Sequence, residues 1–327
     1  MRIGIVIGKF IPLHNGSLSL CKVADELSER LVIIVLNNFQ DKISIKLRES
    51  WLQQEISDPI IKNINIDPFN LTGNILKPLL QEISEKFDDC EIHFFGSEPY
   101  IAKLADSVKA QFTVLDPERL GQNINSASIL SDPYGNWLNM PLSVRKSLIR
   151  RVVLIGPESV GKSSLAKRIN MVFPNLLYLP EYGRNYETFR RKKSYDLEEL
   201  LIISRTHAAH RNALLPFSGP IFIEDTDELA TSVWSEMLIE KTFPALEKQI
   251  KLPELYLLMD PSVPFVQEKT RYFNNQKRKE FFSRIQDKLD SYKANYNILT
   301  GSWKQREEKA LSIISGLLSK KPDWSKF

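Results

Sequence analysis

A short glycine-containing loop carries the clearest chemistry in the sequence. Residues 156–163 read Gly-Pro-Glu-Ser-Val-Gly-Lys-Ser and match the phosphate-binding pattern G-x-x-x-x-G-K-[ST]. In such a loop, backbone N–H groups and the positive end of the next helix favour phosphate oxygens, and Lys162 would reach the β and γ phosphates. The alternative is a turn capped by Ser163 that binds no nucleotide. The residues that we expect to bind a nucleotide are Gly156, Glu158, Ser159, Val160, Gly161, Lys162, Ser163 and Ser164.

Two carboxylates follow a later apolar strand pattern at 220–224. An acidic residue at the end of a neighbouring strand usually completes the metal site of such a loop, so we expect Ser163 and Asp225 to hold Mg²⁺. Asp227 stands one residue further, and one of the two acids could accept a proton from an acceptor hydroxyl. Alternatively, Asp227 caps a helix, and both interpretations can hold together.

Two further groups of polar residues are less decisive. Arg271 lies in a basic segment, where a lid could bring it onto the transferring phosphoryl group, although a solvated loop fits the sequence nearly as well. His207 and His210 lie three residues apart on a predicted helix, but no third metal ligand stands at matching spacing. We therefore interpret both histidines as packing or surface residues.

A second loop, at 8–17, follows the first strand pattern and opens a helix, which again directs backbone N–H groups at an anion. Its arrangement is typical of nucleotidyltransferases with an H-x-G-H signature, in which two histidines stabilise charge on phosphates. His14 occupies the first position and Ser17 the second, so one donor is missing. The alternatives are a satisfied loop histidine at His14 and a helix N-cap at Ser17.

These loops need strands to position them, and the sequence supplies alternating strand and helix patterns. Apolar runs at 2–7, 31–36, 91–95 and 111–115, with amphipathic segments at 18–28 and 99–109, predict a doubly wound parallel sheet. A polar stretch follows at 121–141. The pattern then resumes with strands at 151–155, 220–224 and 255–259 and helices at 162–172, 196–214, 277–292 and 303–318. We expect an α/β chain with two domains, 1–145 and 149–327.

Composition excludes several classes of protein. The 327 residues are 43% hydrophobic and 26% charged, as in a globular chain, and no apolar run approaches the roughly 20 residues that span a membrane. The net charge of +4 is spread over interspersed charges, which argues against nucleic-acid binding. Two distant cysteines and no leader pattern favour a reducing cytoplasm. The sequence is compatible with a homo-oligomer.

Taken together, these motifs resemble the NadR-like family, whose members are bifunctional nicotinamide mononucleotide (NMN) adenylyltransferases and ribosylnicotinamide kinases. The resemblance runs along nearly the whole chain. It is carried by Gly8–His14, Arg48 with Trp51, Phe95–Pro99, Asp116–Arg119, Pro133 with Trp137, Gly156–Ser163, Glu181–Arg184, Asp225–Asp227 and Arg271.

The resemblance implies a Rossmann-like nucleotidyltransferase domain followed by a P-loop kinase domain. The kinase would phosphorylate the 5′ hydroxyl of nicotinamide riboside with ATP and Mg²⁺. Asp225 or Asp227 would bind the acceptor ribose and serve as base or metal ligand, with Glu181 and Arg184 lining the site. Phe265 replaces a tryptophan common in the family, which alters stacking on the nicotinamide ring.

The resemblance also implies that Lys9 and His14 contact ATP and that Arg48 contacts substrate in the first domain. This domain departs from the family pattern, because Ser17 replaces the second histidine and Leu130 replaces a phosphate-binding arginine. Each lost donor commonly costs about 2.7–4 kcal/mol, so two losses predict a fall in adenylyl transfer on the order of 10⁴-fold or more.

Three hypotheses follow. The leading one is a cytoplasmic nicotinamide riboside kinase with weak or lost adenylyltransferase activity. The second keeps both enzymes active, so that the chain also makes NAD from NMN and ATP. The third makes the first domain a module that senses NAD or NMN and couples its occupancy to the kinase.

Overall fold

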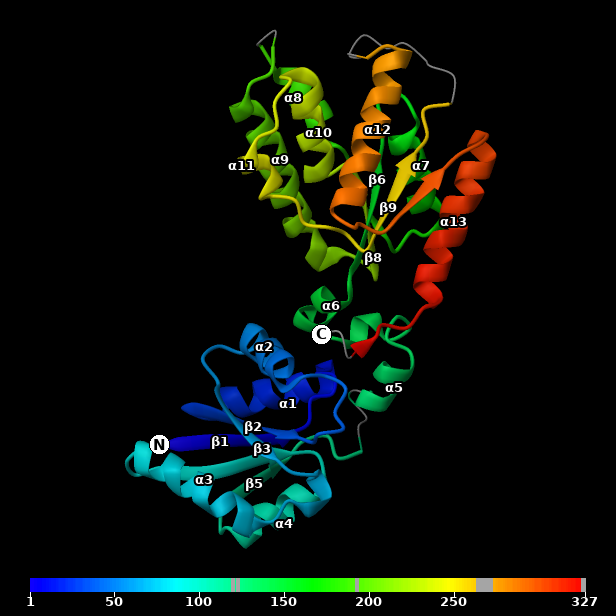
Figure 1. Cartoon of the computed structure of the whole chain (residues 1–327). Helices are drawn as coiled ribbons and strands as arrows, with labels where there is room; N and C mark the ends of the chain where they lie inside the picture. Colours follow the sequence, from blue (N-terminus) through cyan, green and yellow to red (C-terminus); the bar gives the residue numbers. More distant parts are fainter. Residues whose placement is uncertain (119–120, 122–123, 192–193, 263–272, 325–327) are drawn as a thin grey trace. The chain divides into compact units, whose positions relative to one another are not determined.

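The computed structural model describes residues 1–118, 121, 124–191, 194–262 and 273–324. The chain divides into two compact units, Met1–Leu148 with Lys321–Phe327, and Ile149–Lys320. Each unit is built on a five-stranded sheet whose neighbouring strands are all parallel (Figure 1). The predicted α/β class with two parallel sheets is therefore confirmed.

The sheet of the first unit has the order β3-β2-β1-β4-β5. Its strands are β1 (Arg2–Gly8), β2 (Arg30–Asn37), β3 (Ile60–Asn65), β4 (Glu91–Gly96) and β5 (Gln111–Val114). Its helices are α1 (Asn15–Glu26), α2 (Ile45–Glu55), α3 (Gly73–Lys86), α4 (Pro99–Ser107), α5 (Ser126–Ser131) and α6 (Leu142–Leu148). The middle strand, β1, and its neighbour β2 are apolar and buried along their interiors, as expected for parallel strands covered on both faces.

Side chains alternate across β1 and explain how helices cover both faces of this sheet. Ile3 and Ile5 are fully buried in the core cluster that also contains residues of α3 and α4. Gly4 points to the other face, where a Cβ atom would lie 3.1 Å from the carbonyl oxygen of Ala24 in α1. The missing side chain lets α1 approach the strand closely.

The sheet of the second unit has the order β10-β9-β6-β8-β7. Its strands are β6 (Arg150–Ile155), β7 (Leu177–Leu179), β8 (Ile221–Asp225), β9 (Leu255–Met259) and β10 (Tyr296–Leu299). Its helices are α7 (Lys162–Val172), α8 (Tyr182–Phe189), α9 (Leu197–Leu214), α10 (Glu228–Leu238), α11 (Pro244–Glu247), α12 (Asn275–Ser291) and α13 (Trp303–Ser319). Because the strands are parallel, their carboxyl ends meet at one edge of the sheet, where ligands of such folds bind.

The central strand of this sheet, β6, separates two cores. Val152 and Leu154 pack into a cluster with apolar residues of α7 and α13. Val153 and Ile155 point to the opposite face and pack with residues of α10 and α12. This period of two fixes β6 between two helical layers and holds the loop that follows it.

The structure differs from the sequence expectations in several elements. The first helix begins at Asn15 instead of residue 18, because His14 caps it. The sequence did not predict the helices α2, α3, α5, α6, α8, α10 and α11 or the strands β3, β7 and β10, and β7 has only three residues. The polar stretch at 121–141 contains α5 and a 3-10 turn, Trp137–Asn139. Among the described residues, no helix is both long and apolar enough to cross a membrane.

Candidate active site

The loop between β6 and α7 adopts a conformation that glycine makes possible. Gly156 and Gly161 have φ angles of 142° and 88°, a region that residues with a Cβ atom rarely enter. A Cβ atom at Gly156 would also lie 2.8 Å from the carbonyl oxygen of Met259. Gly161 is the residue before α7, so the first turn of this helix opens directly onto the loop. The two glycines thus shape the site where the sequence predicts phosphate binding.

Two polar side chains of the loop lack partners suited to them. Lys162 is only 7% exposed, and its Nζ donates to the carbonyl oxygens of Gly156 at 3.0 Å and Pro157 at 2.9 Å. The hydroxyl of Ser159 is buried and makes no hydrogen bond to the described residues. Phosphate oxygens would be stronger, charged acceptors than these neutral carbonyls. The loop therefore has the donors that a polyphosphate needs.

A hydroxyl and a carboxylate meet beside this loop. The hydroxyl of Ser163 donates to Oδ2 of Asp225, and the hydroxyl of Tyr178 also reaches Oδ2, at 3.5 Å. Burial and the charge of Asp225 raise the pKa of Tyr178, so this phenol stays a donor. Oδ1 of Asp225 is buried and has no hydrogen-bond partner among the described residues. An unpartnered buried carboxylate oxygen attracts a cation or a donor.

The donor set fits a magnesium ion that also binds phosphate. Mg²⁺ prefers oxygen ligands and usually takes one or two from protein, leaving the rest to phosphates and water. Ser163 and Asp225 offer one hydroxyl and one carboxylate, as the loop motif predicts. The described residues contain no group of three or more His, Cys, Asp or Glu that could hold a metal by themselves. Such a group is not needed where phosphate supplies ligands.

Glu181 and Arg184 lie at the same edge of the sheet, after β7. Glu181 precedes α8 without capping it, and its carboxylate lies 3.7 Å from the exposed guanidinium of Arg184. Burial raises the pKa of Glu181. The positive charge of Lys162 acts to lower this pKa, and the negative charge of Asp225 acts to raise it further. The structure thus brings together, close enough for their charges or hydrogen bonds to interact, the predicted residues Lys162, Ser163, Asp225, Glu181 and Arg184.

Asp227 belongs to the framework of the site. Its Oδ1 accepts from the backbone N–H groups of Leu229 at 3.0 Å and Ala230 at 3.2 Å, and so caps α10. Its Oδ2 accepts from the hydroxyl of Tyr256 at 2.6 Å. Burial, reinforced by the charge of Glu228, raises the pKa of Asp227 to about 6. Both oxygens therefore have partners, and the capping interpretation of Asp227 is the one that the geometry favours.

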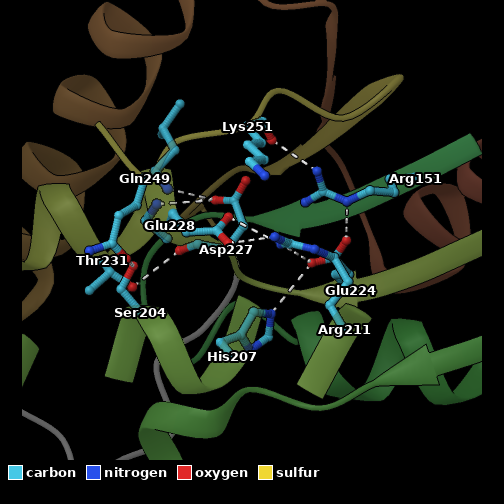
Figure 2. Close-up of polar contacts among 12 residues, drawn as sticks. Arg151, Ser204, His207, Arg211, Glu224, Asp227, Glu228, Thr231, Gln249 and Lys251 are labelled. Atoms are coloured by element: carbon cyan, nitrogen blue, oxygen red, sulfur yellow. Dashed lines mark hydrogen bonds and ion pairs between the residues drawn. The ribbon is translucent and has the colours of Figure 1, made fainter. Parts of the chain in front are cut away.

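A buried ion network anchors the strand that carries Asp225. Figure 2 shows Glu224 between Arg151, Arg211 and His207. Its carboxylate lies 2.5 Å from Arg151, 3.2 Å from Arg211 and 3.5 Å from His207. Arg211 also binds Glu228 at 2.7 Å. Burial raises the pKa of Glu224, but His207 and the two arginines outweigh it and lower the pKa to about 2. His207, on α9, thus packs against β8, in line with the packing role expected from the sequence.

Three further residues were expected at this site from the sequence: Glu158, Phe265 and Arg271. Glu158 uses its side chain to accept from the backbone N–H of Phe273 at 2.7 Å, and its carbonyl accepts from Arg278. Glu158 therefore holds the start of α12 against the phosphate-binding loop. Phe265 and Arg271, expected to stack on substrate and to assist transfer, lie outside the described residues.

The loop after β1 in the first unit has its own polar cluster. Lys9 binds Asp41 at 2.9 Å. Arg48 is fully buried and donates to the carbonyl oxygens of Lys9 at 2.8 Å and Leu36 at 2.9 Å and to Oδ1 of Asn37. Burial lowers the pKa of Arg48. In this structure Arg48 ties the loop to the end of β2, and an acidic side chain neutralises Lys9.

His14 and Ser17 form a reciprocal helix cap. Nδ1 of His14 accepts from the backbone N–H of Ser17 at 3.2 Å. The backbone N–H of His14 donates to the Ser17 hydroxyl, which in turn donates to the His14 carbonyl. The expectation that Ser17 is the N-cap is therefore wrong by three positions: His14 is the cap and Ser17 is the third helical residue. His14 used as an acceptor at Nδ1 keeps its proton on Nε2 when neutral.

Sequence reasoning missed Tyr178 and Trp303. Tyr178 lies on a strand too short to show a period, so its hydroxyl beside Asp225 left no readable signal. Trp303 begins α13, and its ring packs against Gly161. The sequence did hold a signal for Trp303, because it follows a strand and the turn Gly301-Ser302. A turn after a parallel strand lies at the ligand-binding edge of the sheet.

Comparisons with known proteins agree with this architecture. The AAA domain family matches residues 151–306. The chain is 25% identical over 323 residues to the "Trifunctional NAD biosynthesis/regulator protein NadR" of Escherichia coli strain K12, covering 88% of this chain and 76% of that protein. It is 26% identical over 320 residues to the protein of the same name from Salmonella typhimurium strain LT2, covering 87% and 75%.

Two solved structures resemble the whole chain. The crystal structure of a NadR protein in complex with NR has a TM-score of 0.74 at 20% identity and covers 98% of this chain and 97% of that one. The crystal structure of a NadR protein in complex with NAD and AMP-PNP has a TM-score of 0.71 at 19% identity, with the same coverage. These likenesses show the fold.

Proposed function

We propose that this chain, which resembles NadR proteins along most of its length, is a kinase that phosphorylates nicotinamide riboside with ATP to give NMN in NAD biosynthesis. The kinase domain is residues 149–327, and residues 1–145 form a nucleotidyltransferase-like domain with weak or no adenylyl transfer. The names of the relatives and a solved NadR complex with NR support this substrate class. The complex with AMP-PNP supports ATP as donor.

One observation carries the proposal: Oδ1 of Asp225 is buried without a hydrogen-bond partner among the described residues, beside Ser163 and the phosphate-binding loop. In a purely structural carboxylate, as at Asp227, both oxygens have partners. A buried acceptor left open at the edge of the sheet is suited to a ribose hydroxyl or to an ion beside the phosphates.

Each residue of the proposed active site has its own role in the reaction. Lys162 leaves the loop carbonyls for the β and γ phosphates and spreads their charge. Asp225 orients the 5′ hydroxyl of the riboside and accepts its proton as the oxygen attacks the γ phosphorus, while the bond from the γ phosphorus to the bridging oxygen breaks and ADP leaves. Glu181 and Arg184 bind the ribose from α8. Ser163 and Asp225 would hold Mg²⁺, which would neutralise charge on the phosphate oxygens.

The test is to incubate the protein with nicotinamide riboside, ATP and Mg²⁺ and to measure NMN. Lys162→Ala should reduce the rate by at least about 100-fold, because one preorganised cation at the phosphates is lost. Lys167→Ala is the matched control, since Lys167 is an exposed lysine of the same helix. No product from the wild type, or full activity in Lys162→Ala, would refute the proposal.

The second candidate is adenylyl transfer in the first unit. The geometry disfavours it, because Lys9 is paired with Asp41 and the hydroxyl of Ser17 is engaged in the helix cap. Release of pyrophosphate from ATP and NMN distinguishes a fully bifunctional enzyme from a kinase. Binding of NAD without pyrophosphate release would identify the first unit as a sensing module.

The cellular site of the reaction is part of the same proposal. Cys21 and Cys90 are both free thiols, and Cys21 is buried. Burial, with the charge of Asp25, raises the pKa of Cys21 to about 12, which keeps it as an inert thiol. Free cysteines are usual in a reducing compartment, and we place the enzyme in the cytoplasm.

A further inference from the structure

The carboxyl edge of the second sheet has acidic residues on one side of the phosphate-binding loop and β9 and β10 on the other. The phosphate-binding loop follows β6, the middle strand in the order β10-β9-β6-β8-β7. Asp225 ends β8 and Glu181 follows β7, so the acidic groups that would meet the acceptor lie on one side of the loop. A nucleotide whose end phosphate faced Asp225 would have room to extend its base toward the other side of the loop, where β9 and β10 lie.

An exposed indole ring stands on that other side. Trp303 is the first residue of α13, which follows β10. A Cβ atom added to Gly161 would lie 2.5 Å from Cζ3 and 3.2 Å from Cη2 of Trp303, so the ring packs directly on the end of the phosphate-binding loop. The side chain nevertheless keeps 39% of its surface exposed. A large ring partly open to solvent at this place can offer a surface to a second ring.

The backbone around Trp303 is held in place before any ligand arrives. The hydroxyl of Ser302 caps α13, and the backbone N–H of Ser302 donates to Oε1 of Gln305 at 2.8 Å. Arg306 is fully buried and donates to the carbonyl oxygens of Gly301 at 2.9 Å and Asp260 at 2.8 Å. These bonds fix the turn after β10 to the end of β9, so the backbone that carries Trp303 needs no further ordering when a ligand binds.

We propose that Trp303 is the platform on which the purine base of the donor nucleotide stacks. This inference rests on the proposed binding of a nucleotide by the second unit, and it assigns the base to the β10 side. Stacking of a base on an aromatic side chain is worth about 1–3 kcal/mol, and 1.4 kcal/mol corresponds to a tenfold change in affinity. Trp303 should therefore contribute roughly tenfold or more to the affinity for ATP.

The test compares a ligand that has a base with one that has only phosphates. Calorimetric titration of the full chain, in Mg²⁺, uses ATP and inorganic tripolyphosphate. Trp303→Ala should weaken ATP about tenfold and leave tripolyphosphate within twofold of the wild type, whereas Trp303→Phe should retain most of the ATP affinity. Phe217→Ala is the matched control, because it removes an aromatic ring of the same unit that is 76% exposed.

Each outcome decides the question. An equal loss for both ligands in Trp303→Ala, or an unchanged affinity for ATP, would overturn the platform. Full ATP affinity in Trp303→Phe together with the loss in Trp303→Ala supports a stacking role over a general packing defect. The assay also separates this inference from the kinase proposal: Lys162→Ala should weaken both ligands, and the differential loss in Trp303→Ala does not require that nicotinamide riboside be the acceptor.

Discussion

The hydroxyl of Ser163 donates a hydrogen bond of 2.5 Å to Oδ2 of Asp225, which leaves Oδ1 of the same carboxylate buried without a partner among the described residues. The first residue belongs to the helix that begins at the phosphate-binding loop, and the second ends the neighbouring strand. The pair therefore links the element that would hold the phosphates to the element that would meet the acceptor.

Replacing Asp225 should strongly reduce turnover while sparing the fold. In Asp225→Asn the group keeps its size but cannot accept a proton, and general-base groups typically contribute about 10²–10⁴-fold to rate. We expect kcat for NMN formation to fall at least about 100-fold, with an unfolding midpoint in urea close to that of the wild type. Asp287→Asn, at an exposed position of α12, is the control. Unimpaired turnover in Asp225→Asn would remove this residue from the chemistry.

Replacing Asp227 should instead reduce stability. Asp227→Ala removes the cap of α10 and leaves the hydroxyl of Tyr256 buried without its acceptor. A lost N-cap costs about 0.5–2 kcal/mol, and an unsatisfied buried donor costs about 1–3 kcal/mol. Urea unfolding should show that the free energy of unfolding falls by roughly 1.5–5 kcal/mol. A variant of wild-type stability would contradict the framework role.

The raised pKa of Asp227 also predicts a pH dependence of stability. Its folded-state pKa of about 6 lies above the ordinary 3.8, so the folded chain binds this proton more tightly than the unfolded chain does. The contribution is full below about pH 4 and is lost as pH rises through about 6. At 1.36 kcal/mol per pKa unit, two units amount to roughly 3 kcal/mol.

Asp227→Asn, which cannot titrate, isolates this effect. The free energy of unfolding of the wild type minus that of Asp227→Asn should decrease between pH 4 and pH 6.5 and stay level above pH 7. Glu224 acts in the opposite sense, because its pKa of about 2 lies below the ordinary 4.5, so its contribution is lost as pH falls from about 4.5 toward 2. A flat difference across pH 4–6.5 would show that Asp227 is not buried as described.

The sequence predicted the site residues that a local pattern reveals. It did not predict the contacts between residues that are far apart in the chain. The phosphate-binding loop follows one apolar strand and Asp225 ends another, so the sequence alone predicts both at one edge of the sheet. The partner of Asp227 is Tyr256, 29 residues further along the chain, and no local spacing reveals it. The pairing of Lys9 with Asp41 is likewise set by how β1 and the segment after β2 meet in space.

The ion network under β8 should be costly to break. Arg211 contacts the carboxylates of both Glu224 and Glu228, which are almost fully buried. Removing one partner of a buried ion pair commonly costs about 3–5 kcal/mol, because charge is left uncompensated. Arg211→Ala should lose stability in this range in chemical unfolding. Arg151→Ala should lose less, since Arg151 is partly exposed and Glu224 keeps its other partners. The reverse order would show that Arg151 is the main counter-ion.

Restoring the missing donors should partly recover adenylyl transfer in the first unit. In Ser17→His with Leu130→Arg, an imidazole and a guanidinium return to α1 and α5, while His14 remains able to cap α1. Each donor is worth about 2.7–4 kcal/mol when correctly placed. Because Lys9 stays paired with Asp41, we expect only part of this gain, a rise of about tenfold or more in pyrophosphate release from ATP and NMN. Ser19→His with Leu130→Arg, which puts the imidazole at an exposed position of the same helix, should give no rise. Equal activity in the two double variants would mean that position 17 does not face the phosphates and that the first unit has lost more than these two side chains.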